Sequence, residues 1–208
     1  MYGLNASGPA PKSLSVAALK DRGFEKIPSY GVEPVDVPGA VAGWMTLHER
    51  FGKLPLEEVM APAIRYAEEG YPVTPNISRL WQEAFENYSK YRDRPEFQGW
   101  FDTFAPNNTW LKPGEMFRCP DMAKTLKEIA ATKGESFYRG AIAEKIDAFF
   151  KKHNGFLTKE DLAAFKPEWV DPISVNYHGV DVWELPPNGH GITVLMALQI
   201  LKDMKLGE

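Results

Sequence analysis

The sequence has a single cysteine, no long apolar run and no excess of basic residues, and each shortage excludes a class of structure or function. Cys119 is the only cysteine among 208 residues, so no internal disulfide can form. No apolar run approaches the ~20 residues that a membrane-spanning helix needs, so we expect no membrane segment. The net charge is -4 and Lys and Arg are interspersed with Asp and Glu, so we expect no nucleic-acid partner.

Motifs for metal binding and for the common nucleophiles are also missing. The histidines stand far apart, and none has another His or Cys at a metal-ligand spacing: His48, His153, His178 and His190. The segment around Ser136 lacks the closing glycine of a Gly-x-Ser-x-Gly elbow and does not follow a strand. We therefore expect no metal site, no cofactor and no catalytic residue within this chain.

A glycine-containing stretch near the end of the chain allows two interpretations. Residues 188–191 read Asn-Gly-His-Gly and lie between a candidate strand and an apolar helix, where free N–H groups could hold an anion. The dinucleotide fingerprint requires a third glycine where Val194 stands, and Pro186 and Pro187 interrupt the approach. We favour a structural turn over a nucleotide site.

Helical patterns dominate the chain, and glycine follows most of them. We expect helices at 13–22, 40–51, 56–69, from 74 onward, at 121–133 and 141–152, and a short one after residue 158. Candidate N-caps are Ser13, Thr74, Asp121 and Thr158. Asp161 stands at the capping-box position relative to Thr158. Pro62 should kink the helix at 56–69 or split it in two.

Strands are few and short. Residues 32–37 form one candidate, and 173–177 with 180–185 form a hairpin around His178-Gly179. Residues 88–117 mix aromatics with proline and glycine, which predicts a packed loop whose rings fill a core or interface rather than line a ligand site. The prediction is a mainly helical α+β fold, a single segment over 1–208 without an internal boundary. Strands so short and so far apart indicate that other polypeptide supplies most of their sheet.

Eight short motifs, rich in Pro and Gly, cover almost the whole chain. They are Asn-Ala-Ser-Gly-Pro-Ala-Pro at 5–11, Val-Asp-Val-Pro-Gly at 35–39, Gly-Lys-Leu-Pro at 52–55, Ala-Pro-Ala-Ile at 61–64, Ala-Glu-Glu-Gly at 67–70, Phe-Tyr-Arg-Gly at 137–140, Thr-Lys-Glu-Asp-Leu at 158–162 and Pro-Pro-Asn-Gly-His-Gly-Ile at 186–192. In this order they resemble the large subunit of the γ-glutamyltransferases (γ-glutamyltranspeptidases), especially the acylase-like branch. The motifs are mostly architectural, so they speak to fold more than to substrate.

The resemblance implies an N-terminal-nucleophile hydrolase. In such enzymes a precursor cleaves itself, and the new terminal Thr of the small subunit attacks a γ-glutamyl or related acyl amide. The acyl group then passes to water or to an amine. The nucleophile requires its own free α-amine as base, and neither Met1-Tyr2 nor any Thr in this sequence meets that requirement. The resemblance therefore implies a large-subunit segment that is inactive without the missing small-subunit segment.

One departure from the family pattern concerns substrate recognition. Family members commonly carry an Arg just ahead of the Ala-Pro pair, where a guanidinium suits the α-carboxylate of a glutamyl donor. Pro9 stands there in this chain, which puts that contact in doubt. Asn5, Ser7 and Gly8, next to this position, are implied to line the acyl pocket. Other arginines could replace the missing charge only if the fold brings them near: Arg22, Arg50 and Arg65.

A function of a different class remains open from sequence alone. The same architecture could serve as a non-catalytic helical binding or scaffold module. Coding sequence beyond Glu208 would separate the two, since a Thr-Thr-His junction favours a precursor and a stop favours a scaffold. If the segment folds alone, we expect self-association or a sticky apolar patch at the surfaces that would otherwise meet the missing strands.

Overall fold

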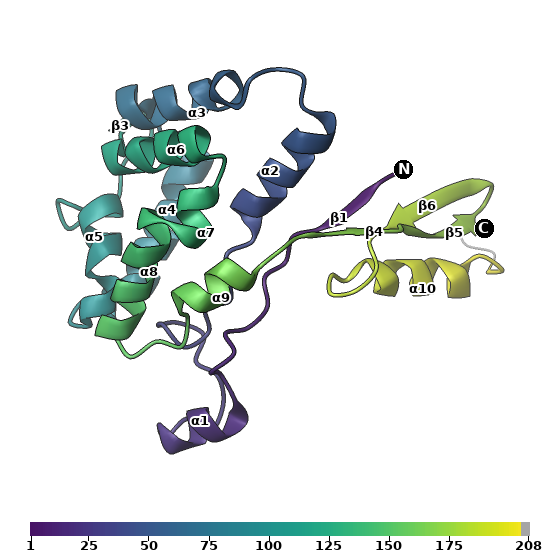
Figure 1. Cartoon of the computed structure of the whole chain (residues 1–208), viewed down its shortest axis with the longest axis horizontal. Coiled ribbons are helices and arrows are strands. Elements are labelled where there is room, and N and C mark those ends of the chain that lie inside the picture. Colours follow the sequence, from purple (N-terminus) through teal and green to yellow (C-terminus); the bar gives the residue numbers. More distant parts are fainter. Residues whose placement is uncertain (205–208) are drawn as a thin grey trace.

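The computed structural model describes residues 1–204, and Figure 1 shows helices gathered into one body with an arm extending from it. The helices are α1 (Val16–Asp21), α2 (Ala40–Phe51), α3 (Leu56–Glu69), α4 (Pro75–Ser89), η1 (Pro95–Phe97), α5 (Gln98–Phe104), α6 (Pro120–Thr132), α7 (Glu135–Arg139), α8 (Ala141–Lys152), α9 (Lys159–Ala164) and α10 (Gly191–Leu201). The strands are β1 (Gly3–Asn5), β2 (Tyr71–Pro72), β3 (Met116–Phe117), β4 (Glu168–Val170), β5 (Ile173–Tyr177) and β6 (Val180–Glu184). The mainly helical α+β prediction is confirmed.

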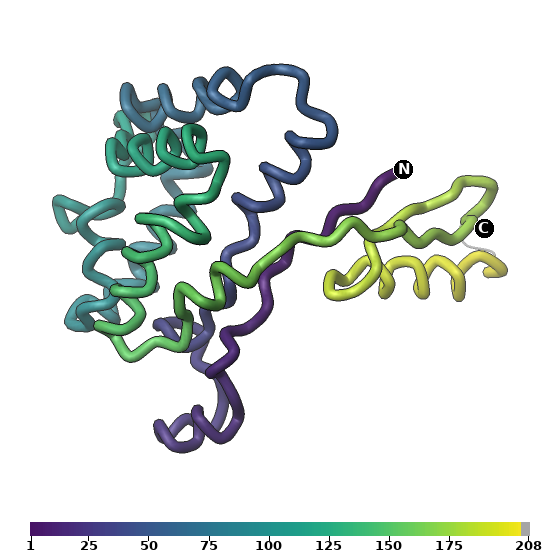
Figure 2. Tube along the Cα trace, viewed as in Figure 1, coloured from purple at the N-terminus to yellow at the C-terminus, as the bar shows by residue number. Residues whose placement is uncertain are grey.

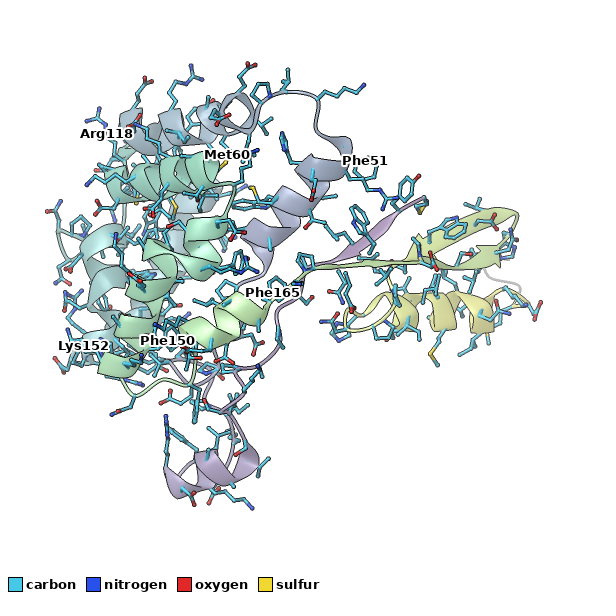
Figure 3. The ribbon with its side chains drawn as sticks, in the orientation of Figure 1. Phe51, Met60, Arg118, Phe150, Lys152 and Phe165 are labelled. Atoms are coloured by element: carbon cyan, nitrogen blue, oxygen red, sulfur yellow. The ribbon has the colours of Figure 1, made fainter. Side chains whose placement is uncertain are left out.

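The main core lies where α2 and α3 meet α6 to α9. Leu157 and Leu162 are almost completely buried in it, together with Ile129 and Phe150. Full burial of one such side chain stabilises the fold by about 1.5–3 kcal/mol. Figure 3 shows Met60, Phe150 and Phe165 distributed through this body. Burial of the apolar faces of these amphipathic helices in one core therefore stabilises them, because helix propensity alone is not sufficient.

The aromatic segment at 88–117 is more regular than predicted. It contains η1, α5 and β3, whereas the sequence predicted a loop. Phe97 and Phe101 form a second core with Ala105, and the rings of Tyr91 and Phe97 stack with centroids 4.8 Å apart. The expectation that these aromatics fill a core is confirmed for this cluster. Ring packing supports a two-turn helix here despite the surrounding Pro and Gly residues.

Two predicted N-caps are each wrong by two positions. Ser15, not Ser13, caps α1, and the Ser13 hydroxyl instead donates to Phe156 O at 3.0 Å. Helix α6 begins at Pro120 after Cys119, because the fixed φ of proline suits a first helical turn. Asp121 lies in that first turn. The Thr74 cap and the Thr158 capping box are both present as predicted.

Pro62 does not divide helix α3, which runs as one element from Leu56 to Glu69. Proline removes only one intrahelical hydrogen bond, and Glu58, whose carbonyl loses that bond, is exposed to water. Residues 32–37 were predicted as a strand but form irregular backbone. Gly31 adopts a positive φ of 125° just before them, and Pro34 has no N–H to donate to a ladder.

Three two-stranded antiparallel ribbons account for the strands of the described residues. The β5–β6 hairpin is as predicted, and positive φ angles of 48° at His178 and 86° at Gly179 match the twist of a two-residue turn. Strands β1 and β4 pair with Gly3 opposite Val170, which the sequence did not predict. Figure 2 shows the chain running side by side in these two segments, which lead from the helical body to the arm formed by β5, β6 and α10.

Candidate functional site

The candidate residues Asn5, Ser7 and Gly8 lie where the chain leaves strand β1. Asn5 ends the strand opposite Glu168 of β4 and is half-buried, while Ser7 is exposed. Gly3 fixes the start of the strand, since a Cβ there would lie 2.6 Å from Leu185 Cδ2 and 2.9 Å from Val170 O. Asn5 is therefore positioned by contacts with the last fifth of the chain, from β4 onward.

The side chain of Asn5 links two distant parts of the sequence. Its Oδ1 accepts a hydrogen bond from the backbone N–H of Ser7 at 3.0 Å, which closes a local turn. Its Nδ2 donates to Asn188 Oδ1 at 3.1 Å, across 183 residues. The fold thus brings the motif at 5–11 against the motif at 186–192, which the sequence treated as separate.

Close backbone contacts hold residues 6–8 against residues 37–39. A Cβ on Gly8 would lie 1.7 Å from Val37 O, and one on Gly39 would lie 1.8 Å from Ala6 O. The N–H of Val37 also donates to Pro9 O at 3.0 Å. Since no side chain fits at either glycine, both motifs need Gly for packing rather than for chemistry.

Tyr138 holds the segment around Gly39 by two hydrogen bonds. Its ring is buried, and its hydroxyl donates to Pro38 O at 2.7 Å and accepts from the N–H of Ala42 at 3.0 Å. Burial raises the pKa of the Tyr138 hydroxyl, so this group keeps its proton near neutral pH. Phe165, labelled in Figure 3 where α9 leads into β4, lies against Gly39 from the other side.

Sequence comparison assigns these features to a family. The family model for γ-glutamyltranspeptidase matches residues 1–208, the whole chain. The chain belongs to the γ-glutamyltranspeptidase family.

Relatives with different described activities share this likeness. A glutathione hydrolase proenzyme of Pseudomonas aeruginosa is 34% identical over 97% of this chain and 35% of its own length. An Acylase ACY 1 proenzyme of Pseudomonas sp. strain V22 is 33% identical over 85% of this chain and 31% of its own length. The chain therefore spans about a third of the length of the curated relatives it matches.

Solved structures show the same relationship. A cephalosporin acylase from Bacillus halodurans is 51% identical over 100% of this chain and 39% of its own, with a TM-score of 0.97. The γ-glutamyltranspeptidase of Helicobacter pylori is 28% identical over 99% of this chain and 59% of its own, with a TM-score of 0.87. The fold predicted from the motifs is thus the γ-glutamyltranspeptidase fold.

Arg22 and Arg50 could have replaced the charge of the family arginine, but both pack against aromatic rings of this chain. The guanidinium of Arg22 lies 3.8 Å from the ring centroid of Phe156 and donates to Asn154 O. Arg50 lies 4.1 Å from the ring centroid of Tyr2 and 4.3 Å from that of Trp169. Figure 3 shows the neighbouring Phe51 at the end of α2 that faces β1. Pro9 itself is exposed, and it leaves its position without charge.

The stretch at 188–191 forms the turn before α10, as the structural interpretation predicted. His190 precedes the first helical residue, Gly191, and a Cβ on Gly191 would lie 2.6 Å from Glu184 Oε2. A carboxylate therefore lies beside the helix N-terminus, which leaves an anionic nucleotide phosphate facing a like charge. Asn188 in this turn accepts the hydrogen bond from Asn5, a contact that the sequence did not predict.

The polar groups of the candidate residues gather at the turn that follows strand β1. Within residues 1–204, no cluster of three or more His, Cys, Asp or Glu side chains is arranged to hold a metal ion. None of the helices in that range is long and apolar enough to cross a bilayer. The turn at 5–8 presents a hydroxyl, an amide side chain and backbone groups, which can orient a polar substrate by hydrogen bonds.

Proposed function

We propose that this chain is part of the large subunit of a γ-glutamyltransferase-like amidohydrolase. The complete enzyme moves an acyl group from a γ-glutamyl or related amide to water or an amine, using a Thr nucleophile outside these residues. The observation that carries this proposal is the likeness to the Bacillus halodurans cephalosporin acylase, 51% identical over the whole chain at a TM-score of 0.97. Such a match favours a shared catalytic framework as well as a shared fold.

Asn5, Ser7 and Gly8 line the acyl pocket in this proposal. Their support is the turn in which Asn5 Oδ1 holds the Ser7 N–H at 3.0 Å, next to a glycine that no side chain can replace. These contacts fix the positions of polar groups before a substrate arrives, and such preorganisation is what an acyl pocket needs. Their role is to bind and orient the acyl group, while the reacting hydroxyl comes from the other segment.

The residue at position 9 bears on which acyl donor this pocket prefers. Pro9 supplies neither a charge nor an N–H at the position where the family commonly has Arg. Arg22 and Arg50 pack on aromatic rings, which favours structural roles for both. We therefore propose that an acyl group without a carboxylate competes well with the γ-glutamyl group in this pocket.

The missing small-subunit segment is the proposed partner, and the arm offers the surface for it. Helix α10 is apolar on all sides, which is typical of a buried helix, yet Met196 is 59% exposed and Ile200 is 64% exposed. A groove of about 410 Å³ lies between β5 and α10, lined mostly by apolar side chains that include Ile173 and Leu195. A further layer of polypeptide over this face would bury these side chains.

A hybrid enzyme tests the proposal. This chain would replace the matching 39% of the Bacillus halodurans acylase. In this proposal the remainder of that protein supplies the Thr nucleophile. We expect the hybrid to cleave itself and to hydrolyse acyl p-nitroanilides, since the replaced part shares its fold almost completely. Thr→Ala at the nucleophile of the added part is the control, and it should abolish both reactions.

The hybrid also separates the proposal from the scaffold alternative. A folded hybrid that cleaves itself but shows no amidase activity on γ-glutamyl, glutaryl or uncharged acyl p-nitroanilides would contradict the proposed function. A thermal transition close to that of the parent acylase would show that misfolding is not the cause.

A further inference from the structure

We propose that Asn188 is a positioning residue for the acyl pocket, acting through Asn5 on the turn that ends at Ser7. This inference rests on the proposed function, because it assigns a role within the same pocket. Asn188 lies outside the motif at 5–11 and is brought next to Asn5 only by folding of the chain.

The hydrogen bonds form one continuous chain. Asn188 Oδ1 accepts from Asn5 Nδ2 at 3.1 Å, and Asn5 Oδ1 accepts from the Ser7 N–H at 3.0 Å. The amide group of Asn5 is planar, so a partner at one end orients the acceptor at the other end. Without Asn188, the Asn5 side chain could rotate away, and the turn at 5–7 would lose its only side-chain restraint among the described contacts.

The turn that carries Asn188 is held independently of this hydrogen bond. Leu185, just ahead of it, packs so closely on Gly3 that no Cβ would fit there. On the other side of the turn, the N–H of Thr193 donates to His190 O at 2.9 Å, which helps fix the start of α10. Asn188 is thus presented to Asn5 by a turn with its own anchors, as a positioning role requires.

The contact also makes the pocket depend on the arm. Asn5 and Asn188 come from opposite ends of the chain, so they meet only when the turn before α10 lies against β1. Because the proposed partner segment covers the same arm, the pocket takes its final shape together with the assembled enzyme. A positioning residue at this junction therefore affects substrate binding more than the chemical step.

The test compares four variants in the hybrid enzyme. Asn188→Ala removes the acceptor, and Asn188→Asp retains an oxygen that can accept from Asn5 Nδ2. Asn5→Ala and the Asn5→Ala/Asn188→Ala double variant complete a mutant cycle. Asn176→Ala is the matched control, since Asn176 is an asparagine in the same arm whose Nδ2 donates to Asp181 Oδ1 at 2.8 Å.

We expect Asn188→Ala to raise KM about tenfold and to leave kcat within about twofold. Asn188→Asp should restore KM to within about threefold of the parent hybrid, because the acceptor remains. The KM of the double variant should be no higher than that of Asn5→Ala, because Asn188 acts only through Asn5. The Asn176→Ala control should leave KM unchanged.

Several results would overturn this assignment. An unchanged KM in Asn188→Ala would do so, whether or not the melting temperature falls. A KM in the double variant that is raised by the product of the two single effects would also do so. If the parent hybrid itself lacks amidase activity, the proposed function fails, and hydrogen exchange in the 208-residue chain still tests the positioning. There, Asn188→Ala should speed exchange of the Ser7 amide about tenfold relative to Asn188→Asp. Equal exchange in the two variants would overturn the assignment.

Discussion

At the scale of single residues, the site depends on groups that fix one another. Asn5 uses both ends of its amide, and Gly8 and Gly39 let two backbone segments touch. Tyr138 bridges Pro38 O and the N–H of Ala42 beneath them. The proposed function gives these groups a role in binding, so their substitutions should change the shape and specificity of the proposed pocket before they change the mechanism.

Pro9→Arg should shift donor preference toward the γ-glutamyl group. A guanidinium at this exposed position would provide the bidentate donor that a carboxylate prefers. In the hybrid enzyme, the ratio of kcat/KM for γ-glutamyl-p-nitroanilide to that for an uncharged acyl p-nitroanilide should rise about tenfold. Pro9→Ala is the control, since it removes the ring and adds no charge. An equal ratio in the Arg and Ala variants would show that position 9 does not face the donor.

Gly8→Ala should destabilise the chain strongly although it adds only a methyl group. The new Cβ would lie 1.7 Å from Val37 O, so the two segments must separate and lose their packing. We expect a loss of about 3 kcal/mol or more in the free energy of unfolding, measured by urea denaturation. Gly99→Ala is the matched control, because nothing lies within 4 Å of its Cβ and Ala is the better helix former. Equal stability of the two variants would refute the close contact.

At the scale of elements, the sequence predicted most helices because their signals are local. Thr74 before Pro75 and the Thr158 capping box mark helix starts within a few residues, and the hairpin turn is marked in the same way. The three-residue strands β1 and β4 are too short to show a period, and their pairing connects the two ends of the chain. The same reason hid the contact between Asn188 and Asn5, which are 183 residues apart. The candidates Asn5, Ser7 and Gly8, by contrast, come from the resemblance of a single motif.

The junction of α8 and α9 offers a pH-dependent test at this scale. The buried Asp147 carboxylate accepts from Lys151 Nζ at 2.6 Å and from the N–H of Lys159 at 3.2 Å. The Lys151 hydrogen bond, helped by the one from Lys159, lowers the pKa of Asp147 in the folded chain. A lowered pKa stabilises the fold above the unfolded value of about 3.9, and this contribution is lost as the pH falls through the folded pKa.

Asp147→Asn should therefore lower the free energy of unfolding by about 1–2 kcal/mol at pH 7, and by progressively less as the pH falls below about 3.9. Urea denaturation of both proteins across this range measures the difference. Asp121→Asn is the control, because the Asp121–Lys124 pair is almost fully exposed and should give no measurable change. A constant difference between wild type and Asp147→Asn from pH 7 to pH 3 would contradict the role of the charge.

At the scale of the whole molecule, the arm carries an exposed apolar face. Figure 1 shows β5, β6 and α10 extending away from the helical body, so α10 is covered on one side by the hairpin and open on the other. Val194 and Met196 are among its exposed apolar side chains. The few short strands predicted an exposed surface of this kind, although the sequence could not locate it.

The isolated chain should associate with itself through this face. Sedimentation velocity at increasing concentration should show dimers or larger species, because exposed apolar patches of this kind favour burial. Met196→Glu/Ile200→Glu should shift the chain toward monomer, while Leu47→Glu/Leu54→Glu, on exposed apolar residues of the helical body, should not. A clean monomer of the unmodified chain at high concentration would count against this prediction.

The central claim is that these residues form a framework for a nucleophile carried by another segment. The most direct measurement is the amidase rate of the purified 208-residue chain on γ-glutamyl-p-nitroanilide and on glutaryl and uncharged acyl p-nitroanilides, beside that of the hybrid. The account predicts no hydrolysis above background by the chain alone and hydrolysis by the hybrid of at least one of these amides. Hydrolysis by the chain alone, abolished by a substitution within residues 1–208, would contradict the account.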